Sequence, residues 1–206
     1  MKNKIDIIAL LSVISGLFIV VCDYLVQMTT IEADYFVARV MSLDDSVINM
    51  SSYGCIFAFT FWISGMYIVY KTMCKVNKNL SIFCAAGIVY SLFMLAFFHY
   101  SYAMIHNVKT VETDWSILTN ANVPFYPFMF LLLPFLWLIV GISNFSAKAI
   151  IPKWTIIVNP VMLTIITSVI TWIAPKALCL QPGVFSLGIT IYYIICWMSL
   201  KRNSND

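Results

Sequence analysis

Asp23, His99 and His106 are ionisable residues that fall within or at the end of long apolar stretches of this sequence. Asp23 lies about one helical turn from the end of the first stretch. His99 lies in the second half of the third stretch, and His106 lies at or just beyond its end. An ionisable side chain at membrane depth is unfavourable unless it is paired or hydrated. Each of these residues is therefore a candidate functional residue.

The spacing of the histidines places them on one side of a helix. His99, Tyr102 and His106 follow one another at intervals of three and four residues, which brings their side chains to one helical face. Asp23 belongs to a face of the first stretch that also carries small residues, which let a second helix approach closely. We therefore predict that Asp23, His99, Tyr102 and His106 line one ligand-binding site, with Asp23 and His99 as candidate catalytic residues.

Contact between Asp23 and His99 depends on whether their helices are neighbours, because the two residues lie at similar depth. A carboxylate beside an imidazole fixes the orientation and tautomer of the ring. Such a pair serves as a proton relay, as a general acid and base, or only as a structural bridge. The sequence leaves these three roles open.

A metal site is not expected. Zinc takes three or four protein ligands. His99 and His106 lie roughly 10 Å apart along a straight helix, too far to share one ion. The sequence also contains no H-E-x-x-H, G-x-S-x-G or phosphate-loop motif. We expect no metal and no cofactor.

Composition places the chain in the membrane. Of its 206 residues, 62% are hydrophobic and 10% are charged, whereas soluble domains carry about 25% charged residues. The net charge of +3 is not gathered into the dense basic stripe that nucleic-acid binding requires. We expect the lipid bilayer as the surroundings and no nucleic-acid partner.

Six apolar stretches are long enough to cross a bilayer as helices, which takes about 20 residues. The sequence therefore predicts an all-α fold, a single transmembrane domain over 1–206 built as a six-helix bundle. The predicted spans lie near 5–27, 53–71, 80–104, 124–144, 155–174 and 183–200, and the predicted outer loops are 28–52 and 105–123.

Basic residues predict the orientation of these spans, since lysine and arginine are enriched in cytoplasmic segments. With the N-terminus inside, nine basic residues are cytoplasmic and three are external. The acidic residues near the outer ends include Glu32, Asp44 and Glu112. We predict a multi-pass protein of the cell membrane with both termini in the cytoplasm.

The six cysteines are scattered and form no C-x-x-C pair, so core packing is the simpler interpretation. Cys22, Cys55 and Cys179 fall near the same side of the membrane. The sequence does not decide whether two of them form a disulfide.

Several short motifs are spread over most of the chain. They are Gly16 with Asp23, Tyr35-Phe36 with Met41-Ser42, Gly65-Met66-Tyr67, His99, Ile151-Pro152-Lys153-Trp154, Asn159-Pro160, and Gly183 with Gly188. In these motifs the chain resembles a family of small, mostly bacterial, six-span membrane proteins listed as a domain of unknown function. Lys153 stands where the family pattern leads us to expect arginine. The resemblance implies the six-span architecture and carries no activity.

Four functions remain open from the sequence. The first is binding of a lipid or another small amphipathic molecule in a polar cavity open to the outer leaflet. The second is a membrane enzyme that acts on a lipid or isoprenoid with Asp23 and His99 as acid and base. The third is a non-catalytic partner or immunity-type protein that acts through its outer loops. The fourth is a transporter subunit, which would require an oligomer.

Overall fold

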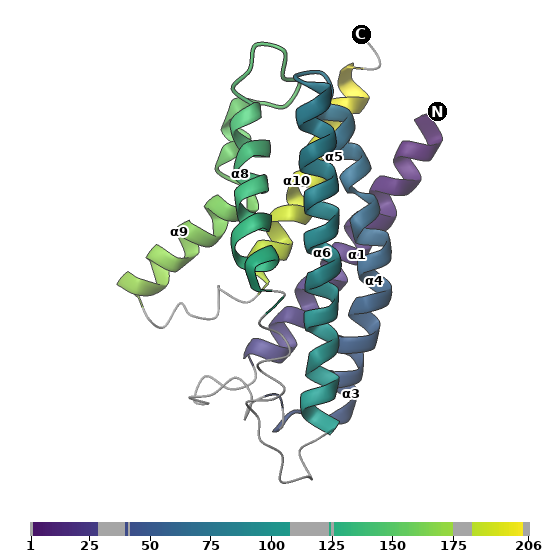
Figure 1. Cartoon of the computed structure of the whole chain (residues 1–206), viewed down its shortest axis with the longest axis vertical. Coiled ribbons are helices and arrows are strands. Elements are labelled where there is room, and N and C mark those ends of the chain that lie inside the picture. The colour runs from purple at the N-terminus through teal and green to yellow at the C-terminus, as the bar shows by residue number, and fades with distance from the viewer. Residues whose placement is uncertain are drawn as a thin grey trace.

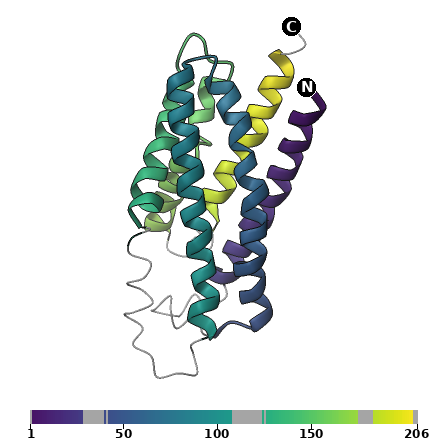
Figure 2. The same cartoon turned by 45° about the vertical axis from the view of Figure 1, so that its right-hand side comes forward.

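The chain is folded almost entirely into helices. In the computed structural model, residues 2–28, 40, 42–107, 124, 126–174 and 183–203 are described, and these residues form helices and turns without a β-strand. Figures 1 and 2 show the helices side by side, with both termini at the same end of the molecule. The predicted all-α fold is confirmed.

Three helices are long and unbroken: α1 (Lys2–Met28), α6 (Lys78–Asn107) and α10 (Val184–Asn203). Between α1 and α6, four helical segments follow one another: α3 (Asp45–Asn49), the π-helix η1 (Met50–Gly54), α4 (Cys55–Ser64) and α5 (Met66–Met73). After α6 come the π-helix η3 (Pro127–Leu132), α8 (Leu133–Ser143), the 3-10 helix η4 (Lys153–Ile156) and α9 (Pro160–Ile173).

Four of these helical segments are long and apolar enough to cross a membrane. They are Lys4–Val26, Asp45–Met73, Lys78–Met104 and Val184–Asn203. Two further apolar helices, Pro127–Ser143 and Pro160–Ile173, are shorter. Each of the six predicted spans thus corresponds to an apolar helix. Helix α3, which begins at Asp45, lies within the range 28–52 predicted as the first outer loop.

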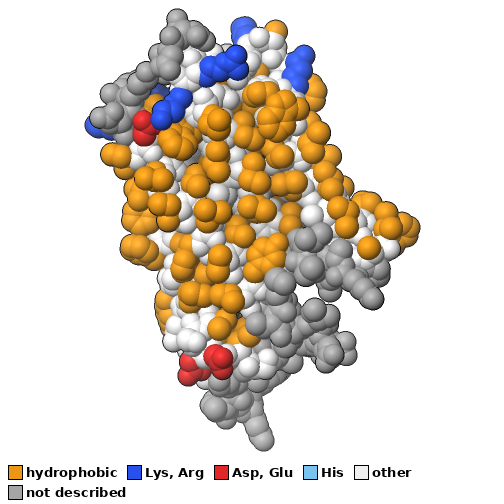
Figure 3. All heavy atoms as spheres, turned by 180° about the vertical axis from the view of Figure 1, so that it is seen from behind, with side chains coloured by type: hydrophobic (Ala, Val, Ile, Leu, Met, Phe, Trp, Pro, Cys, Tyr) orange, Lys and Arg blue, Asp and Glu red, His pale blue; other side chains and the backbone are white. Residues whose placement is uncertain are grey.

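The surface has the pattern of a protein surrounded by lipid. Figure 3 shows a broad hydrophobic belt between two polar ends. The Lys and Arg side chains gather at the end that carries the termini, and acidic side chains lie at the opposite end. Within the belt, large apolar side chains such as Phe57 and Leu131 are each 70% exposed. A soluble protein rarely exposes so large an apolar area, so the structure is consistent with a membrane protein.

The bundle is centred on aromatic side chains. Helix α1 packs along α4 and α10, α6 packs against α4, α5 and α8, and α9 packs mainly on α10. The largest fully buried side chains are Trp62, Trp137, Tyr192, Tyr193 and Phe59. Helix α9 leaves the bundle at an angle (Figure 1), and Trp172 near its end is 84% exposed.

Local sequence explains how α9 begins. The side-chain oxygen of Asn159 accepts a hydrogen bond from the Val161 N–H at 3.1 Å, which caps the helix. The amide nitrogen of Asn159 donates to the Trp137 carbonyl at 2.7 Å. One buried side chain therefore both starts α9 and ties it to α8.

Glycines allow the closest helix contacts. A Cβ atom on Gly16 would collide with Thr190 and with Trp62, whose Nε1 would be 2.6 Å away. At Gly188, a Cβ atom would lie 2.6 Å from the Pro160 Cα. Small residues at such points let two helix backbones approach. These contacts bring α1 against α4 and α10, and α10 against α9.

We predict that Gly188→Ala lowers the stability of the folded protein by about 1–3 kcal/mol, because the added methyl meets the Pro160 backbone, which cannot move aside. Gly87→Ala is the matched control, since its methyl would meet only the flexible end of the Leu136 side chain. Unfolding of the purified variants in detergent micelles measures both effects. Equal losses in the two variants would contradict the packing described for Gly188.

Candidate functional site

The Asp23 carboxylate joins three helices near the end of the bundle opposite the termini. Asp23 lies on α1, and its side chain is 7% exposed. Its Oδ1 atom is 3.3 Å from His99 Nε2 on α6. Its Oδ2 atom accepts a hydrogen bond of 2.8 Å from the Ser186 hydroxyl on α10. Asp23 and His99 therefore meet, and the sequence alone could not settle that question.

The His99 ring is enclosed by protein. Its side chain is 4% exposed, and its Nδ1 atom lies 3.3 Å from the Ser51 carbonyl oxygen. The rings of Phe59 and Tyr102 flank it, with centroids 5.4 Å and 5.1 Å away. Both ring nitrogens thus lie near oxygen atoms, and the ring itself packs against two aromatic side chains.

The contacts of the ring limit its hydrogen-bonding roles. A backbone carbonyl only accepts hydrogen bonds, so a hydrogen bond from His99 to the Ser51 carbonyl uses a proton on Nδ1. Nε2 lies next to the Asp23 carboxylate, which also accepts from the Ser186 hydroxyl.

The π-helix η1 explains why the Ser51 carbonyl is available. In an α-helix this carbonyl would accept the N–H of Cys55, four residues later. Here the Cys55 N–H points to Met50 and Ser52 instead. The Ser51 oxygen is thereby free to accept from His99. π-Helical turns of this kind are frequent at functional sites.

His106 forms a second pair of the same design. Its Nδ1 atom is 3.1 Å from the Val40 carbonyl oxygen, and its Nε2 atom is 2.6 Å from Asp45 Oδ1. The histidine side chain is 3% exposed, whereas the aspartate side chain is 82% exposed. This pair therefore reaches the surface, while the Asp23–His99 pair is enclosed.

A small apolar cluster lies at the same end of the bundle. It contains Val26 of α1, Tyr102 and Ala103 of α6, and Val40, Leu43 and Ile48 of the segment that leads into η1. This cluster is separate from the main core of the bundle. The cluster and His106 hold Val40 and residues 42–49 against α1 and α6. We call these residues the outer cap, after the predicted outer loop 28–52 to which they belong.

The four predicted site residues lie along one face of α6 and the adjoining end of α1. The two histidines have different partners, however. His99 contacts Asp23, which is one of the four, whereas His106 contacts Asp45, which is not. Tyr102 lies between the histidines and packs on His99. All four side chains are buried. The prediction that they bind a ligand stays a prediction.

Two further residues belong to the site. Ser186 lies near the end of its predicted span, as Asp23 does, and donates to the Asp23 carboxylate. Ser51 fell within the predicted outer loop 28–52. No sequence signal marked it, since its role depends on a backbone carbonyl exposed by the π-helix.

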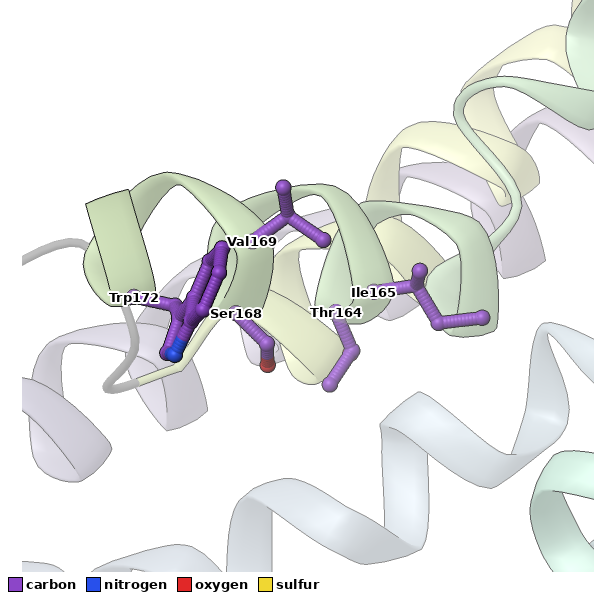
Figure 4. Close-up of a pocket in the computed structure, with 5 residues that line it drawn as sticks. All are labelled: Thr164, Ile165, Ser168, Val169 and Trp172. Carbon is purple, nitrogen blue, oxygen red and sulfur yellow. The ribbon is translucent and has the colours of Figure 1, made fainter.

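An open hollow of about 300 Å³ lies on α9, away from these residues. Figure 4 shows its lining, which comes from this single helix: Thr164, Ile165, Ser168, Val169 and Trp172. The Thr164 hydroxyl is already bonded to the Pro160 carbonyl at 2.8 Å. The hollow is largely apolar and offers little to orient a polar ligand.

Within the described ranges, no group of three or more His, Cys, Asp or Glu residues is placed to hold a metal ion. Cys179, one of the three cysteines considered for a disulfide, lies outside the described residues.

The comparisons with known proteins give a family but no activity. The model of DUF6796, described as a family of unknown function, matches residues 1–203. The chain belongs to this family. The expected resemblance to a family of unknown function is thus confirmed. No curated protein and no solved structure gives a significant match.

We predict strong coupling between Asp23 and His99 in a double-mutant cycle. Asp23→Ala and His99→Ala should each destabilise the fold by about 3–5 kcal/mol, because each leaves a buried partner unpaired. The double variant should lose clearly less than the sum of the two. Free energies of unfolding in mixed micelles measure the cycle. Additive losses would contradict a direct interaction.

Proposed function

We propose that the protein is a multi-pass protein of the cell membrane that binds the polar part of one small amphipathic molecule at the Asp23–His99 site. The observation that carries this proposal is the meeting of Asp23, His99 and Ser186 from three helices, at a depth where polar groups are costly. The proposal has three parts: the orientation of the chain, the chemistry of the ligand and its route to the site.

The distribution of charge supports the orientation. The described Lys and Arg residues lie at the end of the bundle that holds both termini (Figure 3). Exposed Asp44 and Asp45 lie at the start of α3, at the other end. Because cytoplasmic segments are enriched in Lys and Arg, both termini are assigned to the cytoplasm. The two shorter apolar helices, Pro127–Ser143 and Pro160–Ile173, are assigned to the fourth and fifth of six crossings.

The polar groups of the site support the class of ligand. Asp23, His99 and Ser186 offer carboxyl oxygens, imidazole nitrogens and a hydroxyl within one small region. Hydroxyl and carbonyl groups of a lipid or isoprenoid alcohol match these donors and acceptors. The apolar tail would then extend among the surrounding helices.

The burial of the pair means that a ligand must displace protein contacts. The outer cap covers the ends of α1 and α6 next to the pair, and its apolar cluster is separate from the main core. Small clusters of this kind open at a lower free energy than a whole domain. Opening of the outer cap is therefore the proposed route by which a ligand reaches Asp23 and His99.

An enzyme that uses Asp23 and His99 as acid and base is the second candidate, and the carboxylate–imidazole contact favours it. A general base needs a nitrogen directed at the substrate. Both nitrogens of His99 face protein oxygens, so catalysis would require His99 to leave Ser51 or Asp23. Binding requires less rearrangement and is the preferred proposal.

The orientation predicts which exposed positions react from outside the cell. In a chain with Cys74→Ser and Cys179→Ser, Asp44→Cys should react with a membrane-impermeant maleimide on intact cells, whereas Asn77→Cys should react only after permeabilisation. Both positions are exposed, at opposite ends of the bundle, and the remaining described cysteines are buried. The reverse pattern of labelling would overturn the orientation.

Mass spectrometry of an organic extract tests the ligand. The gently purified protein should carry one amphipathic molecule enriched above the bulk membrane lipids, near one per chain. Asp23→Asn and His99→Gln keep a similar size and should lose this molecule while remaining folded, because the donor and acceptor pattern changes.

Asp6→Asn is the matched control. Asp6 lies at the other end of α1 and accepts from Trp197 at 2.6 Å and from Lys201 at 3.1 Å, so its variant should retain the ligand. Extraction of bulk lipid alone from the wild-type protein would contradict the binding proposal. It would direct attention to the outer surface and a protein partner instead.

A further inference from the structure

Two buried thiols lie together beside the Asp23–His99 pair. Cys22 of α1 and Cys55, the first residue of α4, are both fully buried. The Cys22 thiol approaches the Met50 carbonyl oxygen at 3.8 Å, and the same carbonyl accepts the backbone N–H of Cys55. The two cysteines therefore meet at one carbonyl group, where their thiols are close enough to influence each other.

The other described cysteines are arranged differently. Cys74 contacts the Ser81 hydroxyl at 3.0 Å, and Cys196 accepts from Thr72 at 3.7 Å. Cys84 is buried on α6 within the main core. Within the described part of the chain, Cys22 and Cys55 are thus the two cysteines that share a contact, the Met50 carbonyl. Core packing alone does not require two thiols to meet.

The immediate surroundings connect this pair to the candidate site. Asp23 directly follows Cys22 and is close enough to act electrostatically on both thiols. The Ser51 hydroxyl donates to the Cys22 carbonyl at 3.5 Å, and the Ser51 carbonyl accepts from His99. Cys22 is therefore next to both groups that contact the His99 ring, Asp23 along the chain and Ser51 through a hydrogen bond.

We propose that Cys22 and Cys55 form a reversible dithiol–disulfide pair that links α1 to α4 when oxidised. On oxidation, one S–S bond forms as the two thiols lose two protons and two electrons. A quinone dissolved in the bilayer accepts both electrons and both protons and becomes a hydroquinone. Both thiols lie inside the apolar core of the bundle, so the oxidant reaches them when α1 and α4 separate locally, and an oxidant dissolved in the bilayer meets such an opening more readily than a water-soluble disulfide.

The oxidised state would act on the candidate site through Asp23 and the Ser51 carbonyl, the two groups that contact the nitrogens of His99. A bond from Cys22 to Cys55 fixes the residue before Asp23 to the end of η1, which supplies the Ser51 carbonyl. On the proposed orientation, this region lies toward the outer face, next to the compartment in which disulfides persist. The inference does not depend on whether a ligand binds.

The experiment uses the full-length protein in isolated membranes. Membranes are treated with a short-chain benzoquinone or left untreated, then denatured, alkylated with iodoacetamide and digested without reductant. We expect mass spectrometry to identify a peptide pair joined through Cys22 and Cys55 after quinone treatment. We also expect the intact chain to become lighter by two hydrogen atoms and the link to disappear on reduction with dithiothreitol.

Three variants control this experiment. Cys22→Ser and Cys55→Ser should each abolish the link, whereas Cys84→Ser, at another buried cysteine, should leave it unchanged. If either serine variant fails to fold, the wild-type peptide map still decides the question. Complete alkylation of Cys22 and Cys55 after quinone treatment would overturn the proposal. Links from either residue to Cys179, or equal links to Cys84 and Cys196, would overturn it as well.

Discussion

The structure depends on the pairing of the ionisable side chains that are buried within its long apolar helices. At membrane depth such a group is strongly unfavourable unless it is paired. The contact between Asp23 and His99 provides this pairing in the half of the bundle opposite the termini. It also sets which helices are neighbours, because α1, α6 and α10 must all reach the same point for Asp23, His99 and Ser186 to pair.

Polar side chains on one face of α10 make further contacts of this kind along the bundle. Ser186 bonds to Asp23, Thr190 accepts from Trp62 at 3.3 Å, and Trp197 donates to Asp6. These residues recur at helical spacing and point toward α1 and α4. Glycines at 16 and 188 let the backbones approach closely enough for such short side chains to reach. Close packing and polar pairing therefore support each other.

The two histidines of α6 have the same kinds of partner in two different surroundings, one enclosed and one at the surface. Each imidazole lies between a backbone carbonyl and a carboxylate. The enclosed pair ties α1 to α6. The other pair reaches the surface through Asp45 and holds the outer cap. The π-helix contacts His99 through the Ser51 carbonyl, and the outer cap packs on Tyr102, which contacts the same ring.

The sequence by itself determined the class of the fold and the residues of interest. Long apolar runs require helices in a membrane, and the intervals of three and four along α6 already placed His99, Tyr102 and His106 on one face. Tertiary structure alone decided their partners. The pairing of Asp23 with His99, and of Asp45 with His106, depends on which helices pack together, and no local pattern encodes that choice. Ser51 depends on a π-helical turn that redirects one N–H, and the meeting of Cys22 with Cys55 depends on the approach of α1 to α4. These are contacts between segments distant in the chain, so side-chain spacing within one helix could not predict them.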